Sequence, residues 1–514
     1  MNRIVPLLGV AAGLGMSATC MAEQPKKMNV LFIAVDDLKP TLGAYGDTIA
    51  VTPAIDRLAR EGVVFRQTYC QQAISAATRA SLLTGMRPDK TRVWDLVTDF
   101  RQVNSKAVSL PEYFKENGYE SVAWGKIFHI GSAGTGHDAP SWSIPYTNVK
   151  APKYALPTEL NARGKGTATE CADVADDFYL DGKLASEAVQ SMAELSRSDK
   201  PFFLAVGFLK PHLPFVAPKK YWDLYQREEM PLAPYQKKAK GSPDIAYHNS
   251  GELKSYTDIP QFDSWSEEEL KHLSVDKQKE LIHGYYAAVS YMDAQVQKLL
   301  DALDRLGIAD NTIVIFWGDH GWHLGDHGLW NKHTNFENAT HVPMLMRVPG
   351  MKQGIQVQGL CEFVDIFPTL CDLTGLAIPD WLDGESLVPA LKSPDRKLRE
   401  YAFSQYPRTK KIMGYSIRTD NMRYTEWFDS GYNTSEPYDP KRVIGREMYD
   451  YENDPLETEN VIGKASYAKQ QKRMEELFRE AMAREHAQCL RFAERADYHD
   501  PINTQKGYKD PSLD

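Results

Sequence analysis

The chain has 514 residues, a length that suits about three average domains, or one large α/β domain with a smaller companion. Hydrophobic residues make up 42% and charged residues 25%, which excludes a mainly disordered, collagen-like or coiled-coil protein. Asp and Glu outnumber Lys and Arg by 69 to 60, and the resulting net charge of −9 argues against a general nucleic-acid binder. A local basic cluster can still bind an anionic substrate inside an acidic protein.

Residues 1–22 have the pattern of a secretory signal peptide. A short basic start precedes an apolar run at 4–16, and small residues lead to a predicted cleavage site after Ala22. The run is too short to span a bilayer and no later apolar run reaches membrane length, so we expect no membrane span and a periplasmic or secreted protein. The residues before Cys20 fit a lipoprotein signal poorly, which makes lipidation there the weaker alternative. Five cysteines follow, an odd number that leaves at least one unpaired: Cys70, Cys171, Cys361, Cys371 and Cys489.

The next part of the chain alternates strands with helices. Buried strands are predicted at 29–35, 121–124, 202–206 and 312–316, and helices at 110–117, at 277–306 and from Thr52-Pro53 onward. This alternation predicts a mostly parallel sheet with helices on both faces. In such sheets, polar residues just past the strand ends form the ligand crevice.

The pattern changes near residue 395. Polar and aromatic residues alternate at 401–404, 413–418 and 423–427, as in short antiparallel strands, and a helix is predicted at 465–486. We therefore expect three parts: the signal peptide at 1–22, a large α/β domain at 23–395, and a small domain of antiparallel sheet and helix at 396–514.

Acidic residues follow two of the predicted strands. Asp36-Asp37 come directly after the strand at 29–35, and Asp319-His320 follow the strand at 312–316. Together they could converge on one divalent cation, and oxygen-rich ligation with one nitrogen suits Ca²⁺ or Mg²⁺ better than a closed Zn²⁺ site. Each pair alone is weak evidence, since adjacent aspartates after a strand are commonly turn residues.

A predicted helix begins at Ser75 and ends before Gly85. Ser75 and Arg79 are four residues apart and share one helix face. Ser75 lies at the helix start, where backbone N–H groups favour an anion, although a serine there is ordinarily an N-cap. Basic residues follow at Lys126, His129, Lys210, His212 and Lys332. Each alone is ordinarily a solvated charge, but together they suit an anionic substrate with proton transfer nearby.

These residues carry a family resemblance. Ser75-Ala76-Ala77-Thr78-Arg79, followed by Leu83-Thr84-Gly85, resembles the sulfatase signature. Asp36-Asp37, Gly125-Lys126 and Asp319-His320-Gly321 fall where that family places its other site residues. Further stretches resemble iduronate-2-sulfatases in particular, at 125–129, 202–215, 340–343, 404–408 and 412–424. The resemblance runs from about residue 28 to residue 462.

The resemblance implies the alkaline-phosphatase-like α/β fold, a mostly parallel sheet flanked by helices, with a smaller C-terminal α+β domain. It also implies an enzyme that hydrolyses sulfate esters. Ser75 would be converted to formylglycine (3-oxoalanine), whose hydrated aldehyde carries one hydroxyl that attacks sulfur and another that later expels sulfate. A serine in place of the usual cysteine resembles bacterial members that depend on an anaerobic-type maturing enzyme. Ala77 and Thr78, where Pro and Ser are common, are mild departures.

The resemblance also assigns roles to the site residues. One Ca²⁺ would be bound by Asp36, Asp37, Asp319, His320 and the modified Ser75. Arg79 and Lys126 would hold the formylglycine hydroxyls, Lys332 would bind sulfate oxygens, His212 would protonate the leaving sugar oxygen, and His129 would take the proton of the second hydroxyl. Elementary chemistry agrees, because a cation and Lys donors stabilise charge on sulfate and an imidazole suits proton transfer near neutral pH.

Two alternatives stay open at this stage. A phosphatase or phosphonate hydrolase of the same fold needs a second metal cluster, for which His323, His327, His333 and His341 are candidates. A glycan-binding protein with an inactive site is the other.

For a sulfatase, the expected substrate is a sulfated uronic-acid glycan, either a glycosaminoglycan or an algal glycan such as ulvan. The loops expected to read the sugar lie at 131–180 and 216–275.

Overall fold

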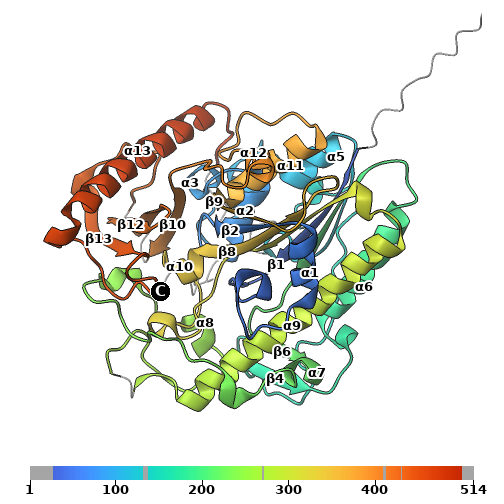
Figure 1. Cartoon of the computed structure of the whole chain (residues 1–514), viewed down its shortest axis with the longest axis horizontal. Helices are drawn as coiled ribbons and strands as arrows, with labels where there is room; N and C mark the ends of the chain where they lie inside the picture. Colours follow the sequence, from blue (N-terminus) through green and yellow to red (C-terminus); the bar gives the residue numbers. More distant parts are fainter. Residues whose placement is uncertain (1–26, 131–136, 269–270, 409–411, 430, 500–514) are drawn as a thin grey trace, which may run out of the picture.

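The computed structural model describes residues 27–130, 137–268, 271–408, 412–429 and 431–499 (Figure 1). The predicted signal peptide, with its cleavage site and Cys20, lies outside these residues. Within them, no helix combines the length and the apolar character needed to cross a bilayer.

The main sheet has seven strands in the order β3-β5-β1-β7-β8-β2-β9. β8 pairs antiparallel with both β7 and β2, and the other pairings are parallel, so the prediction of a mostly parallel sheet is confirmed. The strands are β1 (Asn29–Val35), β2 (Val63–Tyr69), β3 (Glu120–Gly125), β5 (Phe202–Phe208), β7 (Thr312–Gly318), β8 (His341–Arg347) and β9 (Ile355–Glu362).

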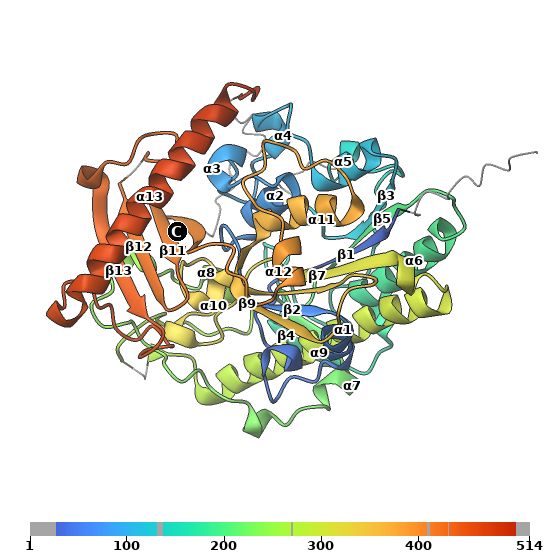
Figure 2. The same ribbon diagram turned by 45° about the horizontal axis from the view of Figure 1, so that its top comes forward.

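Helices cover both faces of this sheet. On one side, Val30, Phe32 and Ala34 of β1 pack in a core with α2 (Ser75–Thr84), α5 (Leu110–Glu116) and α11 (Ile366–Thr374). On the other side, the alternate β1 residues pack with α1 (Pro53–Glu61), α6 (Leu180–Leu195) and α9 (Val275–Arg305). Figure 2 shows the sheet between these two layers. Burial on both faces explains why the central strands read as continuous apolar runs.

Shorter elements complete this part of the molecule: α3 (Pro88–Thr91), α4 (Phe100–Val103), α7 (Lys219–Trp222), α8 (Gly251–Lys254), α10 (Glu337–Thr340), α12 (Val388–Lys392), and the parallel pair β4 (Thr169–Ala172) and β6 (Phe215–Pro218).

The C-terminal part contains a second sheet of four antiparallel strands, as predicted. They are β10 (Ala402–Arg408), β11 (Ile412–Arg418), β12 (Met422–Phe428) and β13 (Val443–Asp450). Helix α13 (Ala468–Ala493) packs across this sheet through Met474, Leu477 and Phe478 (Figure 1). The predicted helix at 465–486 is therefore correct in kind, but it begins later and ends later than the sequence suggests.

A buried carboxylate joins the two sheets. Glu362, the last residue of β9, accepts hydrogen bonds from the Arg87 guanidinium at 2.7 and 2.9 Å and from the Phe403 N–H of β10 at 2.9 Å. It also forms an ion pair with Arg399. Arg87 follows α2. The Glu362 side chain therefore connects a helix of the main core, the end of β9 and the first strand of the second sheet.

Replacing Glu362 should therefore destabilise the protein strongly. Glu362→Ala leaves the buried Arg87 and the partly buried Arg399 without this partner, and we expect a loss of about 3–5 kcal/mol in the free energy of unfolding. Urea denaturation measures the change. The matched control is Glu400→Ala, since Glu400 is 69% exposed in its pair with Arg473 and exposed pairs contribute about 1 kcal/mol or less. Equal effects of the two substitutions would contradict the structural role of Glu362.

Candidate active site

The floor of the site forms where β1 and β7 end. These strands pair in parallel with Val35 opposite Gly318, so Asp36-Asp37 and Asp319-His320 emerge side by side. All four side chains are fully buried, which argues against ordinary solvated turn residues. The ligand atoms of Asp37, Asp319 and His320 lie within 4.8 Å of one another, and those of Asp36, Asp37 and His212 form a second, overlapping group.

Three cationic side chains neutralise the three carboxylates. Arg79 donates to Asp319 Oδ2 at 2.9 Å and to Asp36 Oδ1 at 3.1 Å. Lys126 Nζ donates to Asp36 Oδ2 at 2.6 Å. Lys332 Nζ lies 3.1 Å from both oxygens of Asp37. Charge compensation of this kind is what allows three carboxylates to remain buried.

The pKa shifts follow from burial and from these partners. Burial raises the pKa of Asp37 and of Asp319. Burial alone would also raise the pKa of Asp36, but Lys126, His212 and Arg79 hold it well below its usual range. Burial lowers the pKa of His320 to about 4, so this imidazole is neutral and free to act as a ligand. Carboxylate oxygens with one neutral nitrogen fit a hard divalent cation such as Ca²⁺.

Ser75 lies over this floor as the first residue of α2. It does not cap the helix, contrary to the simplest expectation, because the N-cap position is taken by Ile74 in an extended conformation. The Ser75 hydroxyl instead donates to Asp36 Oδ1 at 3.2 Å and lies 3.1 Å from His320 Nε2. Only 2% of Ser75 is exposed. The helix start therefore directs this oxygen at the acidic cluster, with Arg79 one turn later on the same face, as predicted.

A cavity of about 250 Å³ opens above Ser75. Its lining includes five residues to which the sequence analysis gave catalytic roles, namely Ser75, Lys126, His129, His212 and Lys332. Five more come from the two loops expected to read the sugar, although none was named individually: Arg163, Lys165, Gly251, Glu252 and Ser255. Leu96 and His333 complete the lining, His333 having been considered only for a second metal. Lys210 is absent from this lining. Its Nζ donates to the carbonyls of His212 and Pro214 at 2.7 Å, so it braces the loop that carries His212.

Glu252 in α8 is a site residue that the sequence analysis missed. Its Oε2 lies 2.9 Å from Lys332 Nζ, and its Oε1 lies 3.2 Å from His212 Nε2. Burial alone would raise the pKa of Glu252, but Lys332 and His212 lower it well below its usual range. The carboxylate therefore holds two candidate catalytic groups in place. It stands in Gly251-Glu252-Leu253-Lys254, a segment with no pattern that distinguishes it from an exposed loop.

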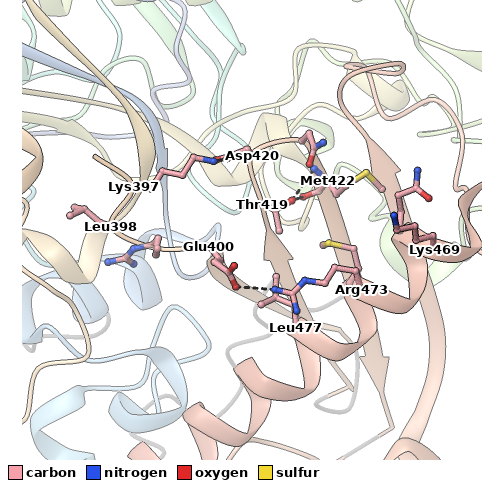
Figure 3. Close-up of a pocket in the computed structure, with 13 residues that line it drawn as sticks. Lys397, Leu398, Glu400, Thr419, Asp420, Met422, Lys469, Arg473 and Leu477 are labelled. Atoms are coloured by element: carbon pink, nitrogen blue, oxygen red, sulfur yellow. Dashed lines mark hydrogen bonds and ion pairs between the residues drawn. The ribbon is translucent and has the colours of Figure 1, made fainter. Parts of the chain in front are cut away.

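A larger groove of about 670 Å³ lies between α13 and the segments around 397–400 and 419–422 (Figure 3). Two of its cations have carboxylate partners: Arg473 pairs with Glu400 at 3.1 Å, and Lys397 pairs with Asp420. None of the residues that line it belongs to a group of potential metal ligands found in the described part of the chain. Its size therefore does not make it the better candidate for the catalytic centre.

The histidines considered for a second metal have other partners. His323 Nε2 lies 2.9 Å from Thr334 Oγ1, His341 Nε2 donates to the Arg66 carbonyl at 2.8 Å, and His327 stacks on Phe336. Over the described ranges, neither these three nor His333 belongs to a group of three or more potential ligands. The geometry thus supports a single metal centre and not the second site of the phosphatase alternative.

Comparisons with known proteins agree with this geometry. The family profile described as Sulfatase matches residues 28–376, and a profile described as N-sulphoglucosamine sulphohydrolase, C-terminal, matches residues 325–484. Human iduronate 2-sulfatase is 35% identical, with 87% of this chain and 95% of the human protein covered.

Solved structures show the same fold. One, determined in complex with its substrate D-glucosamine-2-N,6-O-disulfate, superposes with a TM-score of 0.71 at 22% identity, covering 93% of this chain and all of the other. A phosphonate monoester hydrolase of Agrobacterium radiobacter reaches a TM-score of 0.70 at 22% identity, covering 90% and 96% of the two chains. At such identity these likenesses establish the alkaline-phosphatase-like fold alone, whereas the family profile and the human relative establish more: the chain belongs to the sulfatase family and is a sulfuric ester hydrolase.

Proposed function

We propose that this enzyme is an exported sulfatase that removes sulfate from a uronic-acid-containing oligosaccharide or polysaccharide. The observation that carries the proposal is the cavity itself, where the Ser75 hydroxyl contacts Asp36 and His320 and the cationic side chains Lys126, Arg163, Lys165 and Lys332 contribute to the lining. The human relative is named for a uronic-acid sulfate, which supports a similar substrate here. Glycosaminoglycans and the algal glycan ulvan are the two sources to be compared.

The proposal extends to the whole chain. Residues 1–22 would direct export, 23–395 would form the catalytic domain, and 396–514 the C-terminal domain. Export to the periplasm or beyond would bring the enzyme to sulfated glycans outside the cytoplasm.

The metal would be one Ca²⁺ bound by Asp36, Asp37, Asp319 and His320, with residue 75 as a further ligand. Such an ion polarises sulfate oxygens and acidifies a bound hydroxyl. Ser75 would be oxidised to formylglycine by an anaerobic-type maturing enzyme. The surroundings suit the modified residue as a metal ligand, because the Ser75 oxygen lies within hydrogen-bond distance of two proposed metal ligands.

The remaining side chains would bind sulfate and move protons. Lys332 lines the cavity and would stabilise negative charge on the sulfate oxygens, while Arg79 and Lys126 would hold the groups on residue 75 in place. Burial, with Lys126, lowers the pKa of His129 to about 3, so this imidazole is neutral at physiological pH. So low a pKa makes His129 a weak base, and the role proposed for it, taking the proton of the second hydroxyl, rests on its place in the cavity lining and on the family resemblance. His212 donates from Nδ1 to the Leu213 carbonyl at 2.6 Å, which leaves Nε2 to face Glu252 and the cavity. This orientation suits a general acid.

The first test concerns Ser75. Peptide mass spectrometry of active enzyme should show this residue lighter by the two hydrogens lost on oxidation. Ser75→Ala should abolish turnover of sulfate esters, whereas Ser75→Cys should regain activity in a host with a cysteine-directed maturing enzyme. Active enzyme that carries an unmodified serine would contradict the proposal.

The metal is tested separately. Elemental analysis of purified enzyme should find one Ca²⁺ per chain, and Asp319→Ala should remove both the ion and the activity. Asp310→Ala is a suitable control, since Asp310 precedes β7 at the opposite end of the same strand. Two tightly bound Zn²⁺ ions per chain would instead favour a two-metal phosphatase.

The role of His212 predicts a dependence on the leaving group. Loss of a positioned general acid typically costs about 10²- to 10⁴-fold in rate. His212→Ala should slow hydrolysis of a sugar sulfate by that amount and hydrolysis of 4-nitrophenyl sulfate far less, because nitrophenolate leaves without protonation. Parallel measurements of kcat on both substrates make the comparison. Equal slowing would place His212 in sulfate binding or site structure.

A further inference from the structure

The cationic side chains that line the catalytic cavity fall into two groups. Lys126 and Lys332 contact buried carboxylates at 2.6 to 3.1 Å, so their charge is largely compensated by the floor of the site. Arg163 and Lys165 line the same cavity from the loop before β4. Among the described residues, neither has a carboxylate within ion-pair distance. This side of the cavity therefore presents two positive charges that the protein does not neutralise.

The loop that carries these two residues forms a turn that is held by hydrogen bonds. Asn161 Oδ1 accepts the N–H groups of Arg163 and Lys165 at 3.0 and 3.1 Å, and the Asn161 N–H donates to the Lys165 carbonyl at 2.9 Å. Gly164 has φ of +68°, a conformation that glycine adopts most readily. The backbone positions of both cations are thus set by one asparagine side chain.

The same asparagine ties this turn to the catalytic groups. Its Nδ2 donates to the Ser255 carbonyl at 2.9 Å, and Ser255 directly follows α8, the helix of Glu252. Lys165 Nζ in turn donates to the hydroxyl of Tyr256, the next residue, at 3.2 Å. Since Glu252 contacts His212 and Lys332, the Lys165 ammonium group and the backbone of Arg163 have a defined position relative to the candidate catalytic residues.

Partial burial makes an anionic partner more favourable for Lys165. This side chain is half-buried, and burial lowers the pKa of its ammonium group, an effect that Glu252 only partly opposes. A cation with part of its solvation removed gains most from an anion that arrives with the ligand.

We propose that Arg163 and Lys165 form a second anion subsite, which binds a carboxylate or a second sulfate carried by the substrate beside the sulfate that is removed. The subsite would make the enzyme selective for sugars with two anionic groups over neutral sugars with one sulfate. This inference rests on the proposed function and adds the residues that select the substrate.

The test compares substrates that differ in one charge. The first substrate is a uronic-acid disaccharide with one 2-O-sulfate, which carries both a sulfate and a carboxylate. Its carboxyl-reduced form carries the sulfate alone. A third substrate, the carboxyl-reduced form with a second sulfate, has two anionic groups again but no carboxylate. We expect Arg163→Gln and Lys165→Gln each to lower kcat/KM on the dianionic substrates about tenfold, mainly through KM, since each removes one charge-assisted contact. The carboxyl-reduced monosulfate should change less than about threefold under the same reasoning. The pattern across the two dianionic substrates identifies which anion is bound.

Controls separate this role from a structural one. Arg163→Lys and Lys165→Arg should restore most of the preference, and the melting temperature of each variant should match the unmodified protein. Lys200→Gln removes an exposed lysine outside the cavity and should leave the preference unchanged. Equal losses on dianionic and monoanionic sugars, or an enzyme with no preference between them, would overturn the subsite while the proposed sulfatase function stands. Failure to hydrolyse any sugar sulfate would overturn both.

Discussion

Three carboxylates buried at the ends of β1 and β7 are the charges around which the molecule is organised. Asp36, Asp37 and Asp319 are fully removed from solvent, and an unpaired buried ion costs several kcal/mol. Their partners Arg79, Lys126 and Lys332 come from distant parts of the chain, so the sheet must bring these parts together before the charges balance. The same arrangement leaves a negative, oxygen-rich centre suited to a divalent cation.

This balance also sets the position of the residue over the floor. Arg79 donates to two of the acids and receives further support from the carbonyls of Lys126 and Ile127, which fixes α2 against the ends of the strands. Ser75, one turn earlier, is thereby directed at Asp36 and His320. Glu252 extends the network outward to His212 and Lys332. The ion pairs that compensate the buried charges therefore also set the geometry of the site.

The second sheet contacts the segment that leads into the catalytic helix α2. The Ser404 hydroxyl donates to the Cys70 carbonyl at 2.6 Å, and the Gln405 N–H donates to the Gln71 carbonyl at 2.8 Å. Both contacts hold the segment that leads from β2 into α2, just before Ser75. Together with the contact of Glu362 to Phe403, they show how the C-terminal sheet is attached to the main core.

The sequence by itself determined the features that depend on local pattern. Apolar runs such as 29–35 and 312–316 predicted buried parallel strands, and the acids that follow them predicted the floor of the site, because strand ends gather at one edge of a sheet. Helical spacing placed Ser75 and Arg79 on one face. Tertiary structure alone decided that Ser75 faces inward and does not cap its helix. The sequence indicated the loops 131–180 and 216–275 as the parts that read the sugar, but only the tertiary structure decided that Glu252, Arg163 and Lys165 are the residues of these loops that reach the cavity. Their segments carry no periodic signal and meet the site through long-range contacts.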